Sequence, residues 1–198
     1  MINNEIRKEY KFIINKNNSE KLFNLMGKKL EKIYQPRVVK SLYMDTQKFK
    51  LFNESQDEDI DKFTLRYRTY SNSSSVYLEV KKNLQSGKYK EKFDTDFNNL
   101  NQINYLIFNK LFTVPTLFVS YSREYYKFNN ARITLDTRIE YSNTLNRSLS
   151  TKSYCADISI LEIKLLNEKD LDIENIFFDN PQAFSKYRFG ISKIYNFE

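Results

Sequence analysis

Regular alternation of apolar and polar residues over short segments is the feature that most constrains the fold of this 198-residue chain. Successive side chains of a β-strand point to opposite faces, so alternation indicates a strand with one buried face. The pattern occurs in eight segments: 6–14, 39–45, 63–70, 76–82, 88–97, 117–128, 132–141 and 158–166. The polar run 71–75 between two of them predicts a hairpin loop.

Helical spacing is found in fewer segments. A helix is expected over 19–33, where Ser19 is a candidate N-cap and apolar residues recur on one side. Shorter helices are expected over 47–52, 101–112 and 171–178. These patterns together predict an α+β fold, mainly antiparallel β, with a few helices packed outside the sheet. One domain is expected over residues 1–198.

Composition excludes several classes of site. The chain has no His, three Gly and one Cys, Cys155. These counts exclude His-based metalloproteases and triads, Cys-cluster zinc sites, disulfide frameworks and Gly-rich nucleotide loops. A lone thiol fits a reducing compartment, so a cytoplasmic location is expected. Neither a membrane span nor a signal peptide is expected, because no apolar run is long enough and charge occurs throughout the first residues.

The polar faces of the predicted strands are rich in cations. Arg66 and Arg68 share one face, and Lys88, Lys90 and Lys92 share another. Neighbouring charges of like sign repel unless an anion neutralises them, and the arginine fork suits phosphate. For any single strand, the alternative explanation is an ordinary solvated face of a half-buried sheet.

Carboxylates interrupt these basic faces at Glu9, Glu79, Asp136 and Glu162. Carboxylate oxygens are hard ligands that suit Mg²⁺ or Mn²⁺. If the strands close into a barrel with the charged faces inward, the bore would hold a polyanion together with a divalent cation. Glu79 could serve either as a metal ligand or as an ion-pair partner of the basic face. Asp45 is expected to hold a turn rather than a metal.

The order of short motifs along the chain resembles the VTC domain, the polyphosphate polymerase branch of the triphosphate tunnel metalloenzymes. The resemblance covers nearly the whole chain and rests on the order of the motifs, since each alone is weak. The matching motifs are 7–12 (RKEYKF), 41–46 (SLYMDT), 65–68 (LRYR), 78–81 (LEVK), 90–93 (KEKF), 120–123 (SYSR), 132–137 (RITLDT), 161–164 (LEIK) and 184–187 (FSKY).

This resemblance implies a closed, eight-stranded tunnel barrel. It also implies metal-dependent transfer of the ATP γ-phosphate to a growing polyphosphate chain, with ATP and inorganic polyphosphate or tripolyphosphate as partners. The implied catalytic residues are Arg66, Arg68, Lys81, Arg123, Arg132 and Lys186. The implied substrate-binding residues are Lys11, Lys90, Lys92 and Ser185, to which the polar faces of the strands add Arg138 and Lys164. The resemblance further implies that Glu162, with Glu9, holds Mn²⁺ or Mg²⁺.

One departure favours the polymerase branch. The hydrolytic branch of this superfamily opens with Glu-x-Glu-x-Lys, whereas this chain has Arg7, Glu9 and Lys11 in that frame. A tripolyphosphatase or nucleoside triphosphatase on the same tunnel and a non-catalytic polyphosphate-binding module are the alternatives. A nucleic-acid partner is not expected, because aromatic residues at these positions are more often core. A membrane partner that exports the product stays an open alternative.

Overall fold

The computed structural model describes residues 9–14, 30–57, 61–84, 87–128, 131–143, 152–165 and 181–197. The chain divides into two compact units. The first unit is formed by Met1–Val38, Tyr121–Ile139 and Cys155–Phe184, and the second by Val39–Ser120, Glu140–Tyr154 and Ser185–Glu198.

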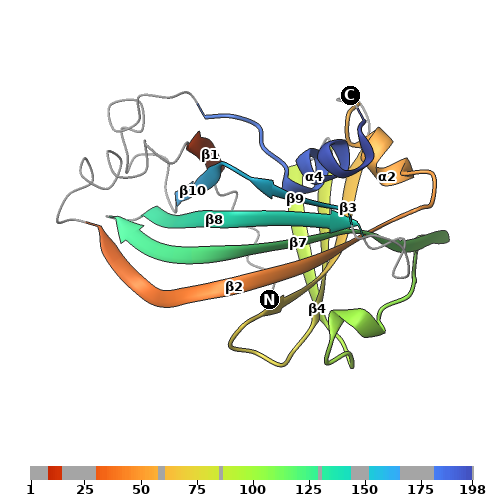
Figure 1. The fold of residues 1–198 in the computed structure, drawn as a ribbon, viewed down its shortest axis with the longest axis horizontal. Coiled ribbons are helices and arrows are strands. Elements are labelled where there is room, and N and C mark those ends of the chain that lie inside the picture. The colour runs from red at the N-terminus through yellow and green to blue at the C-terminus, as the bar shows by residue number, and fades with distance from the viewer. Residues whose placement is uncertain are drawn as a thin grey trace. The chain divides into compact units, whose positions relative to one another are not determined.

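Ten strands form one sheet (Figure 1). They are β1 (Glu9–Ile14), β2 (Glu31–Asp45), β3 (Lys62–Tyr70), β4 (Tyr77–Leu84), β5 (Gly87–Asp94), β6 (Leu106–Phe108), β7 (Leu111–Phe128), β8 (Ala131–Asn143), β9 (Ser153–Ala156) and β10 (Ser159–Leu165). The strand order is β1-β10-β8-β7-β2-β3-β4-β5, with β6 paired to β7 and β9 paired to β8. The long strands β2, β7 and β8 each contribute residues to both units.

The eight strands of this path correspond to the eight segments with alternating residues, so the mainly antiparallel β prediction is confirmed. The short strands β6 and β9 were not expected. In the part of the chain that the structure describes, the path begins at β1 and ends at β5 without closing. The closed barrel is therefore not confirmed.

In the first unit, β1 pairs with β10 and β10 pairs with β8, both antiparallel. One face of these strands carries an apolar core together with Phe128 of β7, and its other members are Phe12, Ile14, Ala131, Ile133, Leu135, Leu161, Ile163 and Leu165. The alternate residues of the same strands include the charged side chains. The period-two pattern therefore assigned the two faces correctly.

In the second unit, β2 pairs with β3, β3 with β4 and β4 with β5, all antiparallel. Its core is formed by Leu42, Met44, Leu51, Leu65, Tyr67, Val76, Val80, Leu100 and Ile103. Residues 71–76 join β3 to β4, which confirms the predicted hairpin loop.

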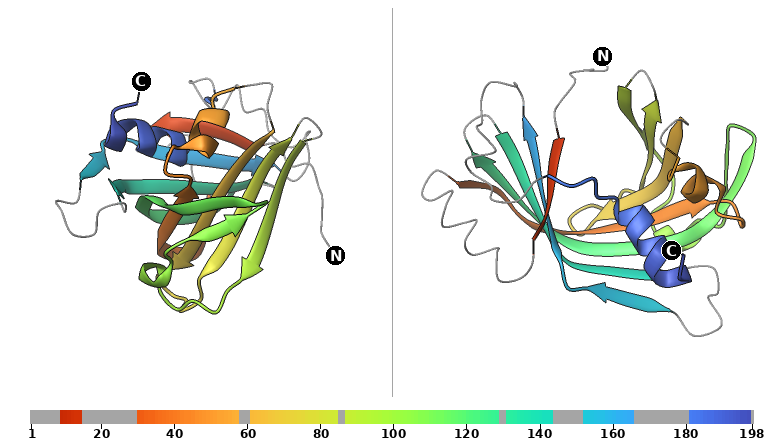
Figure 2. Two further views of the ribbon diagram at one scale, coloured as in Figure 1. Left: turned by 90° about the vertical axis from the view of Figure 1, so that its right-hand side faces the viewer. Right: turned by 90° about the horizontal axis from the view of Figure 1, so that it is seen from above.

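Two helices lie in the second unit, α2 (Lys50–Glu54) and α4 (Lys186–Tyr195), next to each other (Figures 1 and 2). The first confirms the short helix expected near 47–52. Asp45 holds the turn before it, because Oδ1 accepts from the backbone N–H groups of Thr46 at 2.7 Å and Leu51 at 2.8 Å. Its Oδ2 accepts from the hydroxyl of Tyr187 at 2.5 Å, which ties α4 to the same turn.

The helix expected over 101–112 is wrong. The segment forms a short 3₁₀ helix (Leu100–Gln102) and the β6–β7 hairpin, in which Phe108 pairs with Leu111. Asn109 and Lys110 both have positive φ, 48° and 65°, which is the backbone of a tight two-residue hairpin turn. Helical spacing of apolar residues was therefore overridden by the turn.

The other helix predictions have different outcomes. Glu31–Ile33, at the end of the helix expected over 19–33, belong to β2. The rest of that segment apart from residue 30, together with 171–178 and Arg7, lies outside the described residues. Helix α4 was not predicted, although Tyr187, Ile191 and Ile194 are spaced along one buried face. No helix in the described part of the chain is long and apolar enough to cross a membrane.

Substituting Gly190 with alanine should destabilise the second unit. A Cβ atom at this buried helical position would lie 2.4 Å from Cδ1 of Tyr141 and 2.6 Å from Cδ2 of Leu117. Overlap of this kind costs about 1–3 kcal/mol, which exceeds the roughly 1 kcal/mol that alanine gains over glycine in a helix. Urea unfolding should show a net loss of stability.

The matched control is Arg188→Ala, an exposed position of the same helix. It should change the free energy of unfolding by less than about 0.5 kcal/mol. Equal unfolding midpoints for Gly190→Ala and wild type would contradict this packing of α4.

Candidate functional site

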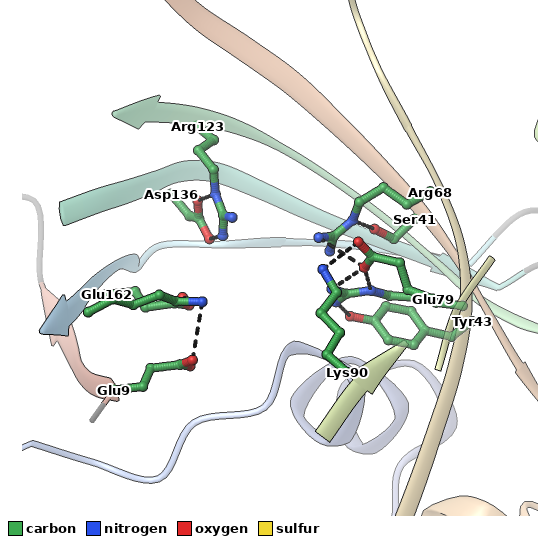
Figure 3. A network of polar contacts seen from close by, with 11 residues as sticks. Glu9, Ser41, Tyr43, Arg68, Glu79, Lys90, Arg123, Asp136 and Glu162 are labelled. Carbon is green, nitrogen blue, oxygen red and sulfur yellow. Dashed lines mark hydrogen bonds and ion pairs between the residues drawn. The ribbon is translucent and has the colours of Figure 1, made fainter. Parts of the chain in front are cut away.

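The second unit gathers polar side chains on one face of β2, β3, β4 and β5, here called the Glu79 cluster (Figure 3). Its members are Ser41, Tyr43, Arg66, Arg68, Glu79 and Lys90. The register explains the grouping, since Tyr43 pairs with Arg66 and Arg66 pairs with Glu79 across three neighbouring strands. Directly paired residues of antiparallel strands share a face.

The Glu79 carboxylate lies at the centre of the cluster and is 1% exposed. Its Oε2 accepts from Arg66 Nε at 2.7 Å and lies 3.3 Å from Nη1 of Arg68. Its Oε1 accepts from Nζ of Lys90 at 2.6 Å. Of the two roles expected for Glu79, the structure shows the ion-pair partner of the basic face.

Two residues of β2 accept hydrogen bonds from the same arginines that contact Glu79. Nη1 of Arg66 donates to the Tyr43 hydroxyl at 3.1 Å, and Nε of Arg68 donates to Oγ of Ser41 at 3.1 Å. Each guanidinium is thus oriented between a carboxylate and a hydroxyl. Sequence reasoning missed both hydroxyl groups. Their spacing could have indicated this role, because Ser41 and Tyr43 are two residues apart, as are the two arginines with which they pair.

The cluster strongly perturbs its titratable groups. Burial would raise the pKa of Glu79, but Arg66, Arg68 and Lys90 outweigh it and hold that pKa well below its usual range. Burial would also raise the pKa of Tyr43, yet the charges of Arg66 and Arg68 lower it below the usual value. The carboxylate therefore stays ionised at neutral pH, and the positive potential of the arginines reaches the Tyr43 hydroxyl.

The same unit contains three further lysines that were predicted as site residues, Lys81, Lys92 and Lys186. Lys81 pairs with Lys90 in the β4–β5 register, so it shares the basic face. Nζ of Lys92 lies 3.4 Å from the centre of the Tyr77 ring, a cation–π contact. The charge of Lys186 acts on Tyr43 and helps to lower its pKa.

Ser185 has a structural role in the described structure. Its side chain accepts a hydrogen bond from the backbone N–H of Arg188 at 3.4 Å and forms the N-cap of α4. A serine at this position satisfies one of the unpaired N–H groups of the first helical turn.

In the first unit, Arg123 of β7 and Asp136 of β8 form a two-point ion pair. Nε of Arg123 donates to Oδ1 at 2.5 Å and Nη2 donates to Oδ2 at 2.7 Å. Burial would lower the pKa of Arg123, but Tyr121 and Asp136 raise it well above the usual value. The two hydrogen bonds therefore fix the position of Arg123 relative to Asp136.

Arg132, also predicted as a site residue, contacts an aromatic ring. Its guanidinium lies 5.5 Å from the centre of the Tyr125 ring.

Arg138 lies in a different environment from the other predicted arginines. It is exposed on β8 and has a left-handed φ of 51°. Other residues make the hydrogen bonds of the Glu79 cluster and of the Arg123–Asp136 pair.

The β1–β10 ladder brings the predicted metal ligands together. Glu9 pairs with Lys164, and Lys11 pairs with Glu162, so charges of opposite sign lie directly across the ladder. Nζ of Lys164 lies 2.8 Å from Oε1 of Glu162 and 3.3 Å from Oε2 of Glu9. Lys11 Nζ lies 3.0 Å from Glu9 and donates to the backbone carbonyl of Phe184 at 3.1 Å.

The two glutamates fit a divalent cation on the chemistry of their oxygens. Both carboxylates reach one ammonium group, that of Lys164, so a cation already lies between them. Burial would lower the pKa of Lys164, but Glu162 and Glu9 raise it above the usual value. In the described part of the chain, no group of three or more His, Cys, Asp or Glu side chains could hold a metal. Mg²⁺ needs only one or two carboxylates when substrate phosphate and water complete its shell.

Replacing Glu79 with glutamine should destabilise the protein at neutral pH. Removing one partner of a buried ion pair costs about 3–5 kcal/mol, because Arg66 and Arg68 then lack their counter-ion. Since the folded-state pKa of Glu79 is depressed, its contribution is present above the unfolded value of 4.5 and is lost as pH falls. Urea unfolding at a series of pH values should show the wild type and Glu79→Gln converging in acid.

Glu91→Gln is the matched control, since Glu91 forms a half-exposed pair with Lys82 at 2.6 Å. Exposed pairs contribute about 0–1 kcal/mol, so this variant should stay close to wild type. A difference between wild type and Glu79→Gln that does not change with pH would rule out the depressed pKa.

Comparison with known proteins identifies the family. The VTC domain model matches residues 6–111 and 97–195. Among curated proteins, none matches the sequence. Solved structures with the same fold include a candidate adenylate cyclase from Bacillus halodurans, with a TM-score of 0.61, 12% identity and coverage of 93% of this chain and 97% of that one.

Two further solved structures have the same fold. A protein of Pyrococcus horikoshii OT3 has a TM-score of 0.56 and 14% identity, and the match covers 96% of this chain and 98% of that one. A candidate adenylyl cyclase from Hippeastrum, described as having a dominant triphosphatase activity, has a TM-score of 0.52 and 13% identity, over 93% and 95% of the two chains. At these identities the structures establish the fold alone. The family model, which spans most of the chain, establishes that the protein belongs to the VTC domain family.

Proposed function

We propose that this protein is a metal-dependent polyphosphate polymerase that transfers the γ-phosphate of ATP to a growing polyphosphate chain inside a basic tunnel. The observation that carries the proposal is the arrangement of Arg66 and Arg68. They lie in the part of the chain that the VTC domain model matches and are both buried, and Glu79, Tyr43 and Ser41 fix their orientation. Oriented guanidinium groups suit phosphate oxygens, which they bind with two hydrogen bonds.

The charge balance of the Glu79 cluster supports an anionic substrate. Three cations, Arg66, Arg68 and Lys90, surround a single carboxylate, so the cluster keeps a positive excess. Lys81 and Lys186 add to that excess. Preorganised positive groups lower the free energy of a transition state in which negative charge spreads over the transferred phosphoryl group.

The chemistry of transfer requires little beyond positioning and charge neutralisation. Arg66 and Arg68 would hold the triphosphate of ATP, and Arg123 and Arg132 would bind further phosphate groups. A terminal polyphosphate oxygen is already an anionic nucleophile, so the absence of His is no obstacle. Mg²⁺ or Mn²⁺ bound by Glu162 and Glu9 would neutralise charge on the phosphate oxygens.

A triphosphatase is the second candidate. It is favoured by the Hippeastrum structure, whose description reports a dominant triphosphatase activity. Hydrolysis would use the same phosphate-binding residues but would attack with water. A module that binds polyphosphate without turnover is the third reading of the same basic face.

A product assay tests the polymerase. ATP with Mn²⁺ or Mg²⁺, with and without a short polyphosphate primer, should give a ladder of long polyphosphate on a gel. Glu162→Ala should reduce the rate at least about 100-fold, because it removes a carboxylate that would hold the metal. Glu140→Ala, an exposed position on β8, controls for the loss of a carboxylate and should retain activity.

Other outcomes of the product assay would contradict the polymerase assignment. ADP and free phosphate without polymer would assign a triphosphatase. Lack of turnover, combined with tight binding of tripolyphosphate, would leave a binding module.

Tripolyphosphate should raise the melting temperature even without turnover. A ligand at 100 times its Kd adds about 2.7 kcal/mol of stability, or about 5–10 °C for a chain of this size. Arg66→Lys keeps a charge beside Glu79 but loses the fork that donates to Glu79 and Tyr43, so it should show less than half of this shift. Differential scanning fluorimetry measures both, with Arg188→Lys as an exposed control. An undiminished shift in Arg66→Lys would count against Arg66 as a phosphate ligand.

A further inference from the structure

Among the described residues, the hydroxyl of Thr134 is a buried polar group without a hydrogen-bond partner. Thr134 lies in β8 and is 4% exposed, and its Oγ1 is inaccessible to solvent. Nearly all buried polar groups are paired in native proteins, so an exception calls for a specific explanation.

The position of Thr134 suggests what its partner would be. In the β8–β10 ladder, Thr134 pairs directly with Glu162, and Arg132 pairs with Lys164 two residues away. Directly paired residues of antiparallel strands share a face, with Cβ atoms about 5 Å apart. The hydroxyl therefore lies on the face that carries Glu162, beside the carboxylate that the proposed function assigns to the metal.

In the described structure, Glu162 already has a charged donor. Nζ of Lys164 lies 2.8 Å from its Oε1 and also reaches Glu9. A divalent cation placed between Glu9 and Glu162 would compete with this ammonium, because both groups neutralise the same oxygens. Carboxylates that bind metals are typically hydrogen-bonded by neighbouring side chains, and the Thr134 hydroxyl is a donor on the same face as Glu162.

We propose that Thr134 is a positioning residue of the metal site, whose hydroxyl donates to the Glu162 carboxylate when that carboxylate holds Mn²⁺ or Mg²⁺. This inference rests on the proposed function, because it takes Glu162 as a metal ligand. The orphaned hydroxyl is then a group that lowers the stability of the metal-free protein and gains its partner in the metal-bound state. Such local costs are typical of functional sites.

The test replaces Thr134 with valine, which has nearly the same shape but no hydroxyl, and with serine, which keeps the hydroxyl. Mn²⁺ affinity is measured by electron paramagnetic resonance of the free ion. Thr134→Val should bind Mn²⁺ about tenfold or more weakly, in the range typical of lost second-layer hydrogen bonds. Thr134→Ser should bind within about threefold of wild type, because the donor is retained.

A second measurement separates this role from a structural one. The melting temperature of metal-free Thr134→Val should equal or exceed that of wild type, by up to about 2–4 °C, because the substitution removes an unpaired buried hydroxyl. A hydroxyl that supports only the fold would give the opposite result. Weaker metal binding in a more stable variant is the expected signature.

Four outcomes would overturn the inference. Equal Mn²⁺ affinity in wild type and Thr134→Val would remove Thr134 from the metal site while leaving the metal site itself intact. A lower melting temperature for metal-free Thr134→Val would show that the hydroxyl has a partner without metal. Unchanged Mn²⁺ affinity combined with weaker tripolyphosphate binding in metal-free buffer would assign the hydroxyl to phosphate instead. If wild type binds no Mn²⁺, the metal-dependent function fails together with this inference.

Discussion

The buried carboxylate of Glu79 is the interaction on which the polar face of the second unit depends. Arg66 and Arg68 are 7% and 4% exposed, and two arginines two residues apart on one strand would repel each other at that depth without an anion. The carboxylate on the neighbouring strand removes this cost. It also fixes both guanidinium groups, since it forms ion pairs with both while Tyr43 accepts a hydrogen bond from Arg66 and Ser41 accepts one from Arg68.

The two units balance the charges on their polar faces differently. In the first unit the β1–β10 ladder alternates Glu9 with Lys164 and Lys11 with Glu162, and Arg123 is paired with Asp136, so charges are balanced locally. In the second unit the cations outnumber the carboxylate. The surplus positive charge therefore lies in the Glu79 cluster, and the two carboxylates proposed to hold a metal lie in β1 and β10.

Strand positions and faces were predictable because period-two alternation is a local property of the chain. The same argument placed Arg66 with Arg68, while the turn at Asp45 was expected from the residue type. Helical spacing was misleading for 101–112, where the two left-handed residues Asn109 and Lys110 form a hairpin turn. Alternation also left the role of Glu79 open, since it assigns a face but not a counter-ion. Strand register, which decides the pairing, depends on residues far apart in the sequence. Closure of the sheet depends on long-range pairing in the same way.

The state of the carboxylates bears on the choice between transfer and hydrolysis. An efficient general base for water needs a pKa near the working pH. Glu79 has the opposite property, because three cations hold its pKa well below the usual range. Asp136 binds Arg123 at two points, and Glu162 and Glu9 share the Lys164 ammonium. A carboxylate with a lowered pKa is a poor proton acceptor, which makes Glu79 a weak candidate for the general base of a hydrolase. A nucleophile that is already an anion, such as a polyphosphate terminus, needs no proton acceptor, and this supports the phosphoryl transfer proposed above.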